Sequence, residues 1–310
     1  MIHNQSRNSE RKSRDNMKIV LWGLGYIYNQ IKNSLSYFEL SNQIEIVGAT
    51  ASYRSKESVI DGYTIYPCEK LMYLDFDYIV ILSDNYFEDI AETAFKLGIS
   101  KEKLLSYKLF LIPNINLKEY ILLKDQRISI LSNNCWGGVV YSTLGLECMS
   151  PTKNLFFEDK DYIKFIKNIE LYLKETPTYS RDGVDVNSFK TYPVLKLKDI
   201  EIHCNHSNSP EAAINDWVRR ANKINLNNLF VQMYTDKEDV AKEFLEIPGL
   251  IKKYCFVPWE DNHECTIYVD LNQANLKPWE VILATATLKN EVFKYDLIKL
   301  LSGEKKLRIK

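Results

Sequence analysis

The heptapeptide S-N-N-C-W-G-G (Ser132–Gly138) contains a thiol, that of Cys135, at a position where it could act as a nucleophile. It follows the apolar run I-S-I-L, which is typical of a buried strand, so Cys135 is predicted in the first turn of a helix. The positive end of a helix lowers the pKa of a thiol. Cys135 is therefore either a nucleophile or a small apolar core residue, and the sequence identifies no base beside it.

The residues around this thiol extend the candidate site. Asn133 and Asn134 could cap the helix or bind a ligand, and the backbone N–H groups near Trp136 and Gly137 would stabilise an oxyanion. Gly137 and Gly138 would let a substrate approach the backbone closely. The alternative for Trp136 is packing in the core. We predict that these five residues contact a ligand.

Two histidines, His203 and His206, lie at the end of the alternating segment 194–204, in front of a predicted turn and helix. The carboxyl end of a strand is where open α/β sheets place ligands, so both are candidates for a catalytic base. Polar residues that merely cap the next helix are the equal alternative. A metal would need a third ligand, for which Glu201, Asp236 and His263 are only guesses, and we predict no metal site.

The helix after these histidines contains Arg219 and Arg220. Successive helical residues point about 100° apart, so at most one of the two is well placed toward a common anion. These arginines either bind an anion or belong to a solvated helix face whose arginine stems cover apolar surface. Asp236 ends the strand-like N-L-F-V-Q-M-Y-T-D and is either a ligand contact or the N-cap of the next helix.

A second candidate site follows the first strand, where W-G-L-G-Y contains Gly23 and Gly25. A G-x-G turn between a strand and a helix leaves backbone N–H groups free to hold a phosphate. The dinucleotide fingerprint is incomplete, because Tyr28 replaces the third glycine and the second strand ends in A-T-A-S without an acid for a ribose. The turn is either structural or binds a nucleotide-sugar rather than NAD, and no cofactor is identified.

Strand and helix signals alternate along most of the chain, which predicts an α/β protein. We expect a disordered tail at 1–16, a Rossmann-like parallel sheet domain at 17–112, a linker at 113–126 and a second α/β domain at 127–310. Within the second domain, Asp161–Lys174 is predicted as one amphipathic helix and Thr176–Lys190 as a mobile loop. A C-terminal helix is predicted over roughly Asn290–Leu301.

Composition limits the class of protein. In the 310 residues, 40 Lys and Arg nearly balance 41 Asp and Glu, so no general field attracts nucleic acid. The six cysteines are scattered without a C-x-x-C pair, which favours reduced thiols. No apolar run is long enough to span a bilayer and no signal peptide is recognisable, so we expect a cytoplasmic protein without membrane insertion.

Five motifs in order resemble a bacterial family of unknown function whose members are often labelled exopolysaccharide biosynthesis proteins. They are S-N-N-C-W-G-G, S-P-T-K-N-L-F-F, I-E-I-H-C-N-H-S, W-V-R-R-A-N-K-I-N and N-L-F-V-Q-M-Y-T-D. The resemblance covers about Arg127–Val257 and implies a role in surface-glycan biosynthesis. The family pattern has L-H-Y where this chain has C-N-H, so the match does not assign a role to His206.

Two functions of different class follow. In the first, the protein is a transferase acting on a sugar or nucleotide-sugar, with acyl transfer through Cys135 and with His203 or His206 as the base. In the second, it binds a nucleotide-sugar or organises a glycan assembly pathway without catalysis. A small-molecule sugar ligand is expected in both, and neither predicts an oligomeric state.

Overall fold

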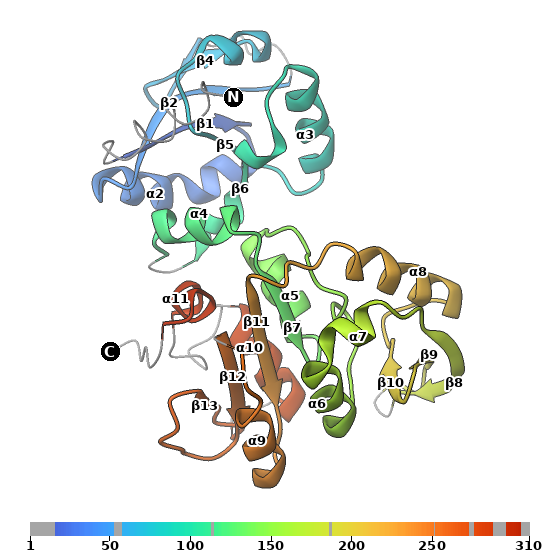
Figure 1. Cartoon of the computed structure of the whole chain (residues 1–310). Coiled ribbons are helices and arrows are strands. Elements are labelled where there is room, and N and C mark those ends of the chain that lie inside the picture. Colours follow the sequence, from blue (N-terminus) through green and yellow to red (C-terminus); the bar gives the residue numbers. More distant parts are fainter. Residues whose placement is uncertain are drawn as a thin grey trace, which may run out of the picture. The chain divides into compact units, whose positions relative to one another are not determined.

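The structure is a computed structural model, shown in Figure 1. It describes residues 16–52, 58–112, 115–185, 188–250, 252–272, 276–287 and 296–304. The chain divides into two compact units after Lys118, inside the stretch 113–126 that was predicted to connect the domains. That stretch contains helix α4 (Leu117–Asp125). Apart from Asn16, the predicted disordered tail lies outside the described residues.

The first domain is a six-stranded sheet of order β3-β4-β2-β1-β5-β6, in which only β3 runs antiparallel to its neighbour. Its strands and helices are β1 (Met17–Trp22), α2 (Tyr26–Leu40), β2 (Ile44–Thr50), β3 (Val59–Ile60), β4 (Tyr63–Tyr66), β5 (Tyr78–Ile81), α3 (Phe87–Lys96) and β6 (Leu104–Ser106). From β1 the chain adds β2 and β4 on one side of the sheet and then β5 and β6 on the other side, so the direction of strand addition reverses at β1. The prediction of a Rossmann-like domain is confirmed by this strand order.

Apolar periodicity explains these elements. The strand β1 is buried on both faces, with Ile19, Val20 and Leu21 fully inaccessible, as expected for a central parallel strand. Helix α2 buries Tyr28, Ile31, Leu35 and Phe38, which recur at helical spacing and cover one face of the helix. The first domain therefore has a core of its own.

The second domain contains two sheets, a parallel one of order β13-β12-β11-β7 and an antiparallel one of order β10-β9-β8. After α4 its elements are β7 (Ser129–Ser132), α5 (Trp136–Leu144), α6 (Asp159–Lys167), α7 (Ile169–Leu173), β8 (Thr178–Val184), β9 (Thr191–Leu197), β10 (Ile200–His203), α8 (Pro210–Ala221), β11 (Leu229–Tyr234), α9 (Glu238–Leu245), β12 (Lys252–Val257), β13 (Thr266–Tyr268), α10 (Pro278–Thr287) and α11 (Leu297–Ser302). The prediction of an α/β protein with a second α/β domain is confirmed.

Helices cover both faces of the parallel sheet (Figure 1). Val231 and Met233 of β11 face a core cluster that includes buried residues of α6, α8 and α9. On the opposite face, Phe230 stacks on Trp136 of α5, and α5 packs against α10. The result is a three-layer arrangement, which leaves the carboxyl ends of the strands as the place where loops and polar side chains gather.

An extended segment, Leu155–Phe157, connects the two sheets of this domain. Phe156 exchanges two backbone hydrogen bonds of 2.9 Å with His203, at the end of β10. The N–H of Phe157 donates to the Asn133 carbonyl oxygen, directly after β7. The end of the antiparallel sheet is thereby fixed beside the carboxyl edge of the parallel sheet.

Two predictions about local structure were wrong. The stretch Thr176–Lys190 is not a loop, because Thr178–Val184 forms β8, paired with β9. Its residues are almost all exposed, so the sequence lacks the apolar alternation that identifies a half-buried strand. The predicted helix Asp161–Lys174 is two helices, because Asn168 interrupts it with φ −133° and ψ 39°.

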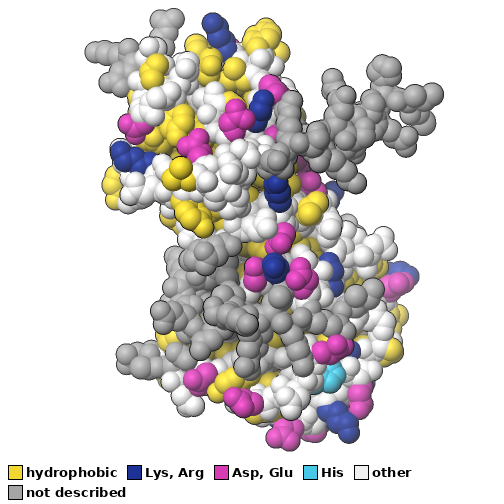
Figure 2. All heavy atoms as spheres, turned by 90° about the vertical axis from the view of Figure 1, so that its left-hand side faces the viewer, with side chains coloured by type: hydrophobic (Ala, Val, Ile, Leu, Met, Phe, Trp, Pro, Cys, Tyr) yellow, Lys and Arg dark blue, Asp and Glu magenta, His cyan; other side chains and the backbone are white. Residues whose placement is uncertain are grey.

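The C-terminal part differs from the prediction in a further helix, α10, which was not predicted. The predicted helix Asn290–Leu301 corresponds to α11 in its second half, and residues 290–295 lie outside the described residues. Within the described part of the chain, no helix is both long and apolar enough to cross a bilayer. Basic and acidic side chains are interspersed on the face shown in Figure 2.

Candidate functional site

The two asparagines of the predicted site are used by the fold itself. Asn133 is 6% exposed, and its side-chain amide donates to the Tyr234 carbonyl oxygen at 2.8 Å and accepts from the Tyr234 N–H at 3.0 Å. Asn134 accepts from the Trp136 N–H at 2.9 Å and so caps α5. The predicted capping is confirmed for Asn134 and wrong for Asn133, whereas ligand binding by either residue stays a prediction.

Cys135 occupies the N-cap position of α5, one residue before the helix begins. Burial raises the pKa of its thiol to about 11, because the thiolate is desolvated. The predicted lowering of this pKa was therefore wrong. The first helical N–H groups are already bound, since Ser132 Oγ accepts from Gly137 at 3.0 Å and Asn134 accepts from Trp136, so they do not stabilise a thiolate.

Trp136 and the two glycines contact protein rather than an open surface. Trp136 is fully buried, and its indole Nε1 donates to Thr285 Oγ1 at 2.8 Å. A Cβ at Gly137 would lie 2.9 Å from Ser132 Oγ, and one at Gly138 would lie 2.8 Å from Asn154 Oδ1. Both glycines are buried and let α5 approach its neighbours closely. The structure thus corrects the expected ligand contacts of these three residues.

His203 and His206 have different environments. His203 is 7% exposed, its ring stacks on Phe156 at 4.4 Å, and its Nδ1 lies 3.2 Å from the Tyr192 hydroxyl. Burial lowers its pKa below the usual histidine range, so the ring is neutral at pH 7. His206 is exposed, in the turn before α8. Among the described residues, no hydrogen bond joins either histidine to Cys135, so the predicted catalytic pair is not assembled.

The arginines of α8 share one carboxylate, which the sequence analysis did not include. Arg219 and Arg220 each donate to Asp216, at 2.6 Å. Arg220 also donates to the Lys153 carbonyl oxygen at 2.8 Å, and only 14% of its side chain is exposed. Arg220 is therefore held by the fold, and Arg219 is the solvated arginine of the pair.

Asp236 is exposed after the carboxyl end of β11. The expected capping role was wrong, because the N-cap residue of α9 is Lys237, which makes no side-chain cap. Lys237 instead pairs with Asp159 at 3.0 Å. Across the described ranges, no three His, Cys, Asp or Glu side chains lie together as a metal would require.

The glycine turn of the first domain lies beside the point where the order of the strands reverses. The Gly23 N–H donates to the Thr50 carbonyl oxygen of β2 at 2.8 Å, and Gly23 has a φ of +103°, which favours glycine. Gly25 is the N-cap of α2, without a side-chain cap and without any atom within 4 Å of a Cβ placed there. The first intrahelical bond runs from Asn29 to Gly25, so the N–H groups of Tyr26–Tyr28 precede it.

Charges near this turn are largely compensated. Asp84 follows β5, and its carboxylate pairs with Lys108 at 2.7 Å and accepts from the Tyr107 hydroxyl at 2.7 Å. Its hydrogen bonds to Lys108 and Tyr107 lower the pKa of Asp84. The carboxylate is therefore ionised, and the ammonium group of Lys108 balances its charge. Tyr28, at the position of the third glycine, is buried and donates to Asp61 at 2.9 Å.

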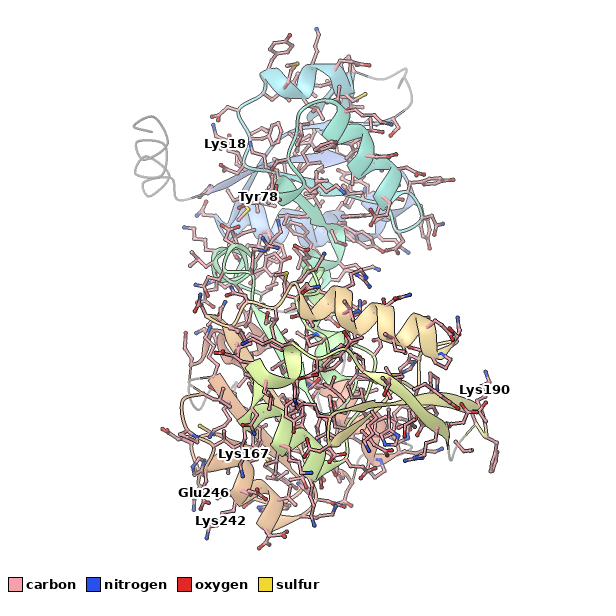
Figure 3. All side chains as sticks on the ribbon, turned by 45° about the vertical axis from the view of Figure 1, so that its right-hand side comes forward. Lys18, Tyr78, Lys167, Lys190, Lys242 and Glu246 are labelled. Carbon is pink, nitrogen blue, oxygen red and sulfur yellow. The ribbon has the colours of Figure 1, made fainter. Side chains whose placement is uncertain are left out.

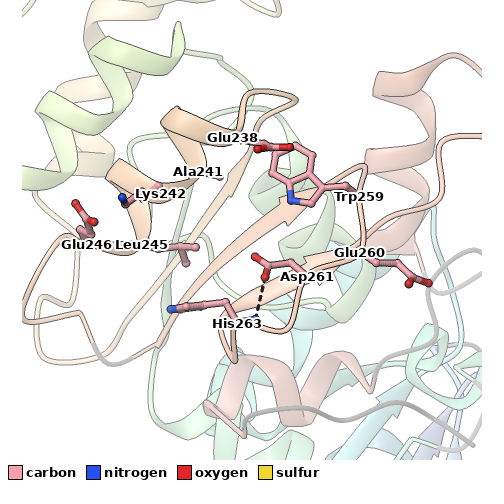
Figure 4. Close-up of a pocket in the computed structure, with 9 residues that line it drawn as sticks. All are labelled: Glu238, Ala241, Lys242, Leu245, Glu246, Trp259, Glu260, Asp261 and His263. Atoms are coloured by element: carbon pink, nitrogen blue, oxygen red, sulfur yellow. Dashed lines mark hydrogen bonds between the residues drawn. The ribbon is translucent and has the colours of Figure 1, made fainter.

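A pocket of about 600 Å³ lies between α9 and the loop after β12, and the sequence analysis missed most of it (Figure 4). Its lining includes Glu238, Lys242, Trp259, Asp261 and His263. Lys242 and Glu246 project from α9 in Figure 3 as well. The signal that could have revealed it is W-E-D-N-H, an aromatic and charged run directly after a buried strand.

Comparison with known families agrees with this two-domain architecture. The family described as "Domain of unknown function (DUF1919)" matches residues 106–301, well over half of the chain. The chain belongs to the DUF1919 family. The description "C2185-like, N-terminal" matches residues 15–105, which correspond to the Rossmann-like domain. The predicted resemblance to a family of unknown function is confirmed, and the DUF1919 description specifies no pathway.

Individual relatives of this DUF1919 protein add little about function. An uncharacterized protein of Haemophilus influenzae is 33% identical over 125 residues, which are 40% of this chain and 57% of that protein. The chain therefore matches little more than half the length of this relative. Aspartate semialdehyde dehydrogenase II of Vibrio cholerae, complexed with ASA, aligns over 75% of this chain and 78% of its own at 10% identity and a TM-score of 0.22.

Proposed function

We propose that this DUF1919 protein binds a nucleotide-sugar, or a similar phosphorylated sugar, at the glycine turn of its first domain and acts in surface-glycan biosynthesis. One observation carries the proposal: α2 begins at Gly25 without a side-chain cap, beside the point where the sheet order reverses. Such a position combines free N–H groups with the positive end of a helix, which favours a phosphate.

The chemistry around the turn favours a nucleotide-sugar over NAD. The last residue of β2 and the two that follow it, T-A-S at 50–52, provide no carboxylate for a ribose. Tyr28 fills the place of the third glycine and holds Asp61, so the helix is packed differently from a dinucleotide site. The surface-glycan context itself comes from the motif resemblance in the second domain.

A transferase activity is the second part of the proposal, and His203 is its best candidate for a base. Its ring is neutral at pH 7 because burial lowers its pKa. Its Nδ1 is paired with Tyr192, while its Nε2 has no partner among the described residues. In the tautomer whose Nδ1–H donates to the Tyr192 hydroxyl oxygen, the neutral imidazole could accept a proton from a sugar hydroxyl at Nε2. Acyl transfer through a Cys135 thiolate has less support, because the raised pKa of that thiol opposes ionisation.

The test is a thermal-shift titration of the full chain with UDP-glucose and GDP-mannose, with NAD for comparison. A ligand that binds the native state raises its melting temperature with concentration. We expect a nucleotide-sugar to do so and NAD to do less. Gly25→Asp should cap α2, keep the melting temperature of the free protein, and abolish the shift by repelling phosphate.

Gly25→Asn is the matched control, since it provides the same cap without the charge. We expect it to weaken binding less than Gly25→Asp does. If no nucleotide-sugar shifts the wild-type melting temperature, or if Gly25→Asp shifts as wild type does, binding at this turn is excluded.

A further inference from the structure

The pocket beside α9 has two walls that the fold holds in place. On one side, Lys253 Nζ donates to the carbonyl oxygens of Leu245 (2.6 Å) and Ile247 (2.5 Å) and so fixes the end of α9. On the other, Asp261 accepts from the His263 N–H at 3.1 Å and from Thr266 Oγ1 at 2.9 Å. The pocket is thus a formed feature of the second domain, with a volume typical of small-molecule sites.

Its lining is strongly acidic. Four carboxylates and one lysine line it, and Glu238 and Glu246 lie one helical turn on either side of Lys242. Among the described residues, neither glutamate forms an ion pair with this lysine. With four carboxylates against one lysine, the described residues of the lining carry an excess of negative charge, to which a cationic ligand would be attracted.

Trp259 provides an aromatic surface in the same pocket. The indole is half-buried, because part of it packs against the core cluster of the second domain while the rest lines the pocket. Glu238 and Asp261 come from α9 and from the loop after β12 and line the same pocket (Figure 4). An indole face next to carboxylates is the usual environment for an ammonium group, since tryptophan gives the strongest cation–π attraction.

His263 adds a hydrogen-bond donor. Its Nδ1 accepts from the Cys265 N–H at 3.1 Å, so in the neutral ring the proton lies on Nε2. That N–H can donate to a hydroxyl oxygen of a ligand. The pocket thus offers a cation site and a hydroxyl site together.

We infer that this pocket binds a hydroxylated primary amine of about monosaccharide size, with its ammonium group between Glu238 and Trp259 and a hydroxyl oxygen on His263. This site is separate from the glycine turn of the first domain and does not depend on nucleotide-sugar binding there. An amine-bearing sugar fits within the volume and matches the charge and the donor.

The experiment is isothermal titration calorimetry of the full chain with glucosamine and glucose at pH 6.5. The two probes share ring and hydroxyls and differ in the ammonium group. We expect saturable binding of glucosamine that weakens with salt and at least about tenfold weaker binding of glucose. Equal affinity for the two sugars, or no saturable binding of glucosamine, would overturn the inference.

Variants locate the site. Glu238→Gln removes no hydrogen bond or ion pair found among the described residues, and Trp259→Phe keeps an aromatic face. Each should weaken glucosamine binding, Glu238→Gln by about tenfold. Glu170→Gln removes the same charge from the exposed side of α7 and should leave affinity within about twofold. Unchanged affinity in Glu238→Gln would show that the amine binds elsewhere. Gly25→Asp should not alter glucosamine binding, so failure here is distinguishable from failure of nucleotide-sugar binding.

Discussion

The Asn133 side chain completes the pairing between β7 and β11 by binding both backbone groups of Tyr234, at 2.8 and 3.0 Å. An asparagine amide has one donor and one acceptor in the arrangement of a peptide group, so it substitutes for one more strand residue. The chain can therefore leave β7 and start α5 while the carboxyl edge of β11 stays fixed. The main role of the S-N-N-C-W-G-G segment is therefore to form the junction between β7 and α5.

Replacement of Asn133 by alanine should destabilise the protein by about 1–3 kcal/mol, because two partly buried backbone groups of Tyr234 lose their partners. Urea unfolding at pH 7 measures this. Asn227→Ala is the control, since Asn227 is exposed and its side chain makes no hydrogen bond within the described part of the chain. Equal stability of the two variants would contradict the role assigned to Asn133.

Gly137→Ala should cost about 1–3 kcal/mol of unfolding free energy, because the new Cβ would meet Ser132 Oγ at 2.9 Å and Ile130 Cγ2 at 3.1 Å. Gly25→Ala has open space around the new Cβ and should change stability much less. Thermal unfolding of both variants makes the comparison. A tolerated Gly137→Ala would mean that α5 is not packed closely on β7.

The stability of the protein should fall as pH drops through the range around 6.5, in part because of His203. Burial lowers the pKa of His203 in the folded state, so as the pH falls the unfolded chain binds a proton at this histidine before the folded chain does. The free energy of unfolding then falls by at most about 1.4 kcal/mol per pH unit for this one group. Above the unfolded pKa the histidine is neutral in both states and contributes no slope. Urea unfolding at several pH values should show a shallower dependence of stability on pH for His203→Phe than for wild type.

Alkylation measures the state of the Cys135 thiol. With a pKa of about 11, only about 0.1% of it is thiolate at pH 8, against about a quarter for an ordinary thiol. Iodoacetamide labelling followed by peptide mass spectrometry should therefore modify Cys135 slowly, with a rate that keeps rising above pH 9. Rapid labelling near pH 7 would support the nucleophile instead.

The fold was largely predictable where apolar periodicity is strong. The buried strands β7 and β11 lie where I-S-I-L and N-L-F-V-Q-M-Y-T-D were predicted as strands, and the helix predicted after the two histidines is α8, where Ser209 Oγ accepts from the Ala212 N–H at 3.2 Å. Prediction failed for β8, because an exposed strand has no apolar alternation and depends on pairing with β9. Long-range pairing of this kind leaves no local signal.

The candidate site was predictable only in part. The strand-to-helix junction at Ser132–Gly138 and the turn at Gly23 and Gly25 were found from their spacing. The burial of these residues could not be predicted from spacing. Burial raises the pKa of Cys135 and places Trp136 in the core. The pocket on α9 combines Glu238 with Asp261, which are distant in sequence and meet through the return of the chain from β12 to β13.

Hydrogen exchange with mass spectrometry, with and without UDP-glucose, tests the central claim most directly. If the sugar nucleotide binds at the glycine turn, UDP-glucose should slow the exchange of the Tyr26–Tyr28 amides in wild type and leave it unchanged in Gly25→Asp, because the phosphate occupies the N–H groups that precede the first bond of α2. Protection confined to the second domain, or none at saturating UDP-glucose, would contradict the proposed function.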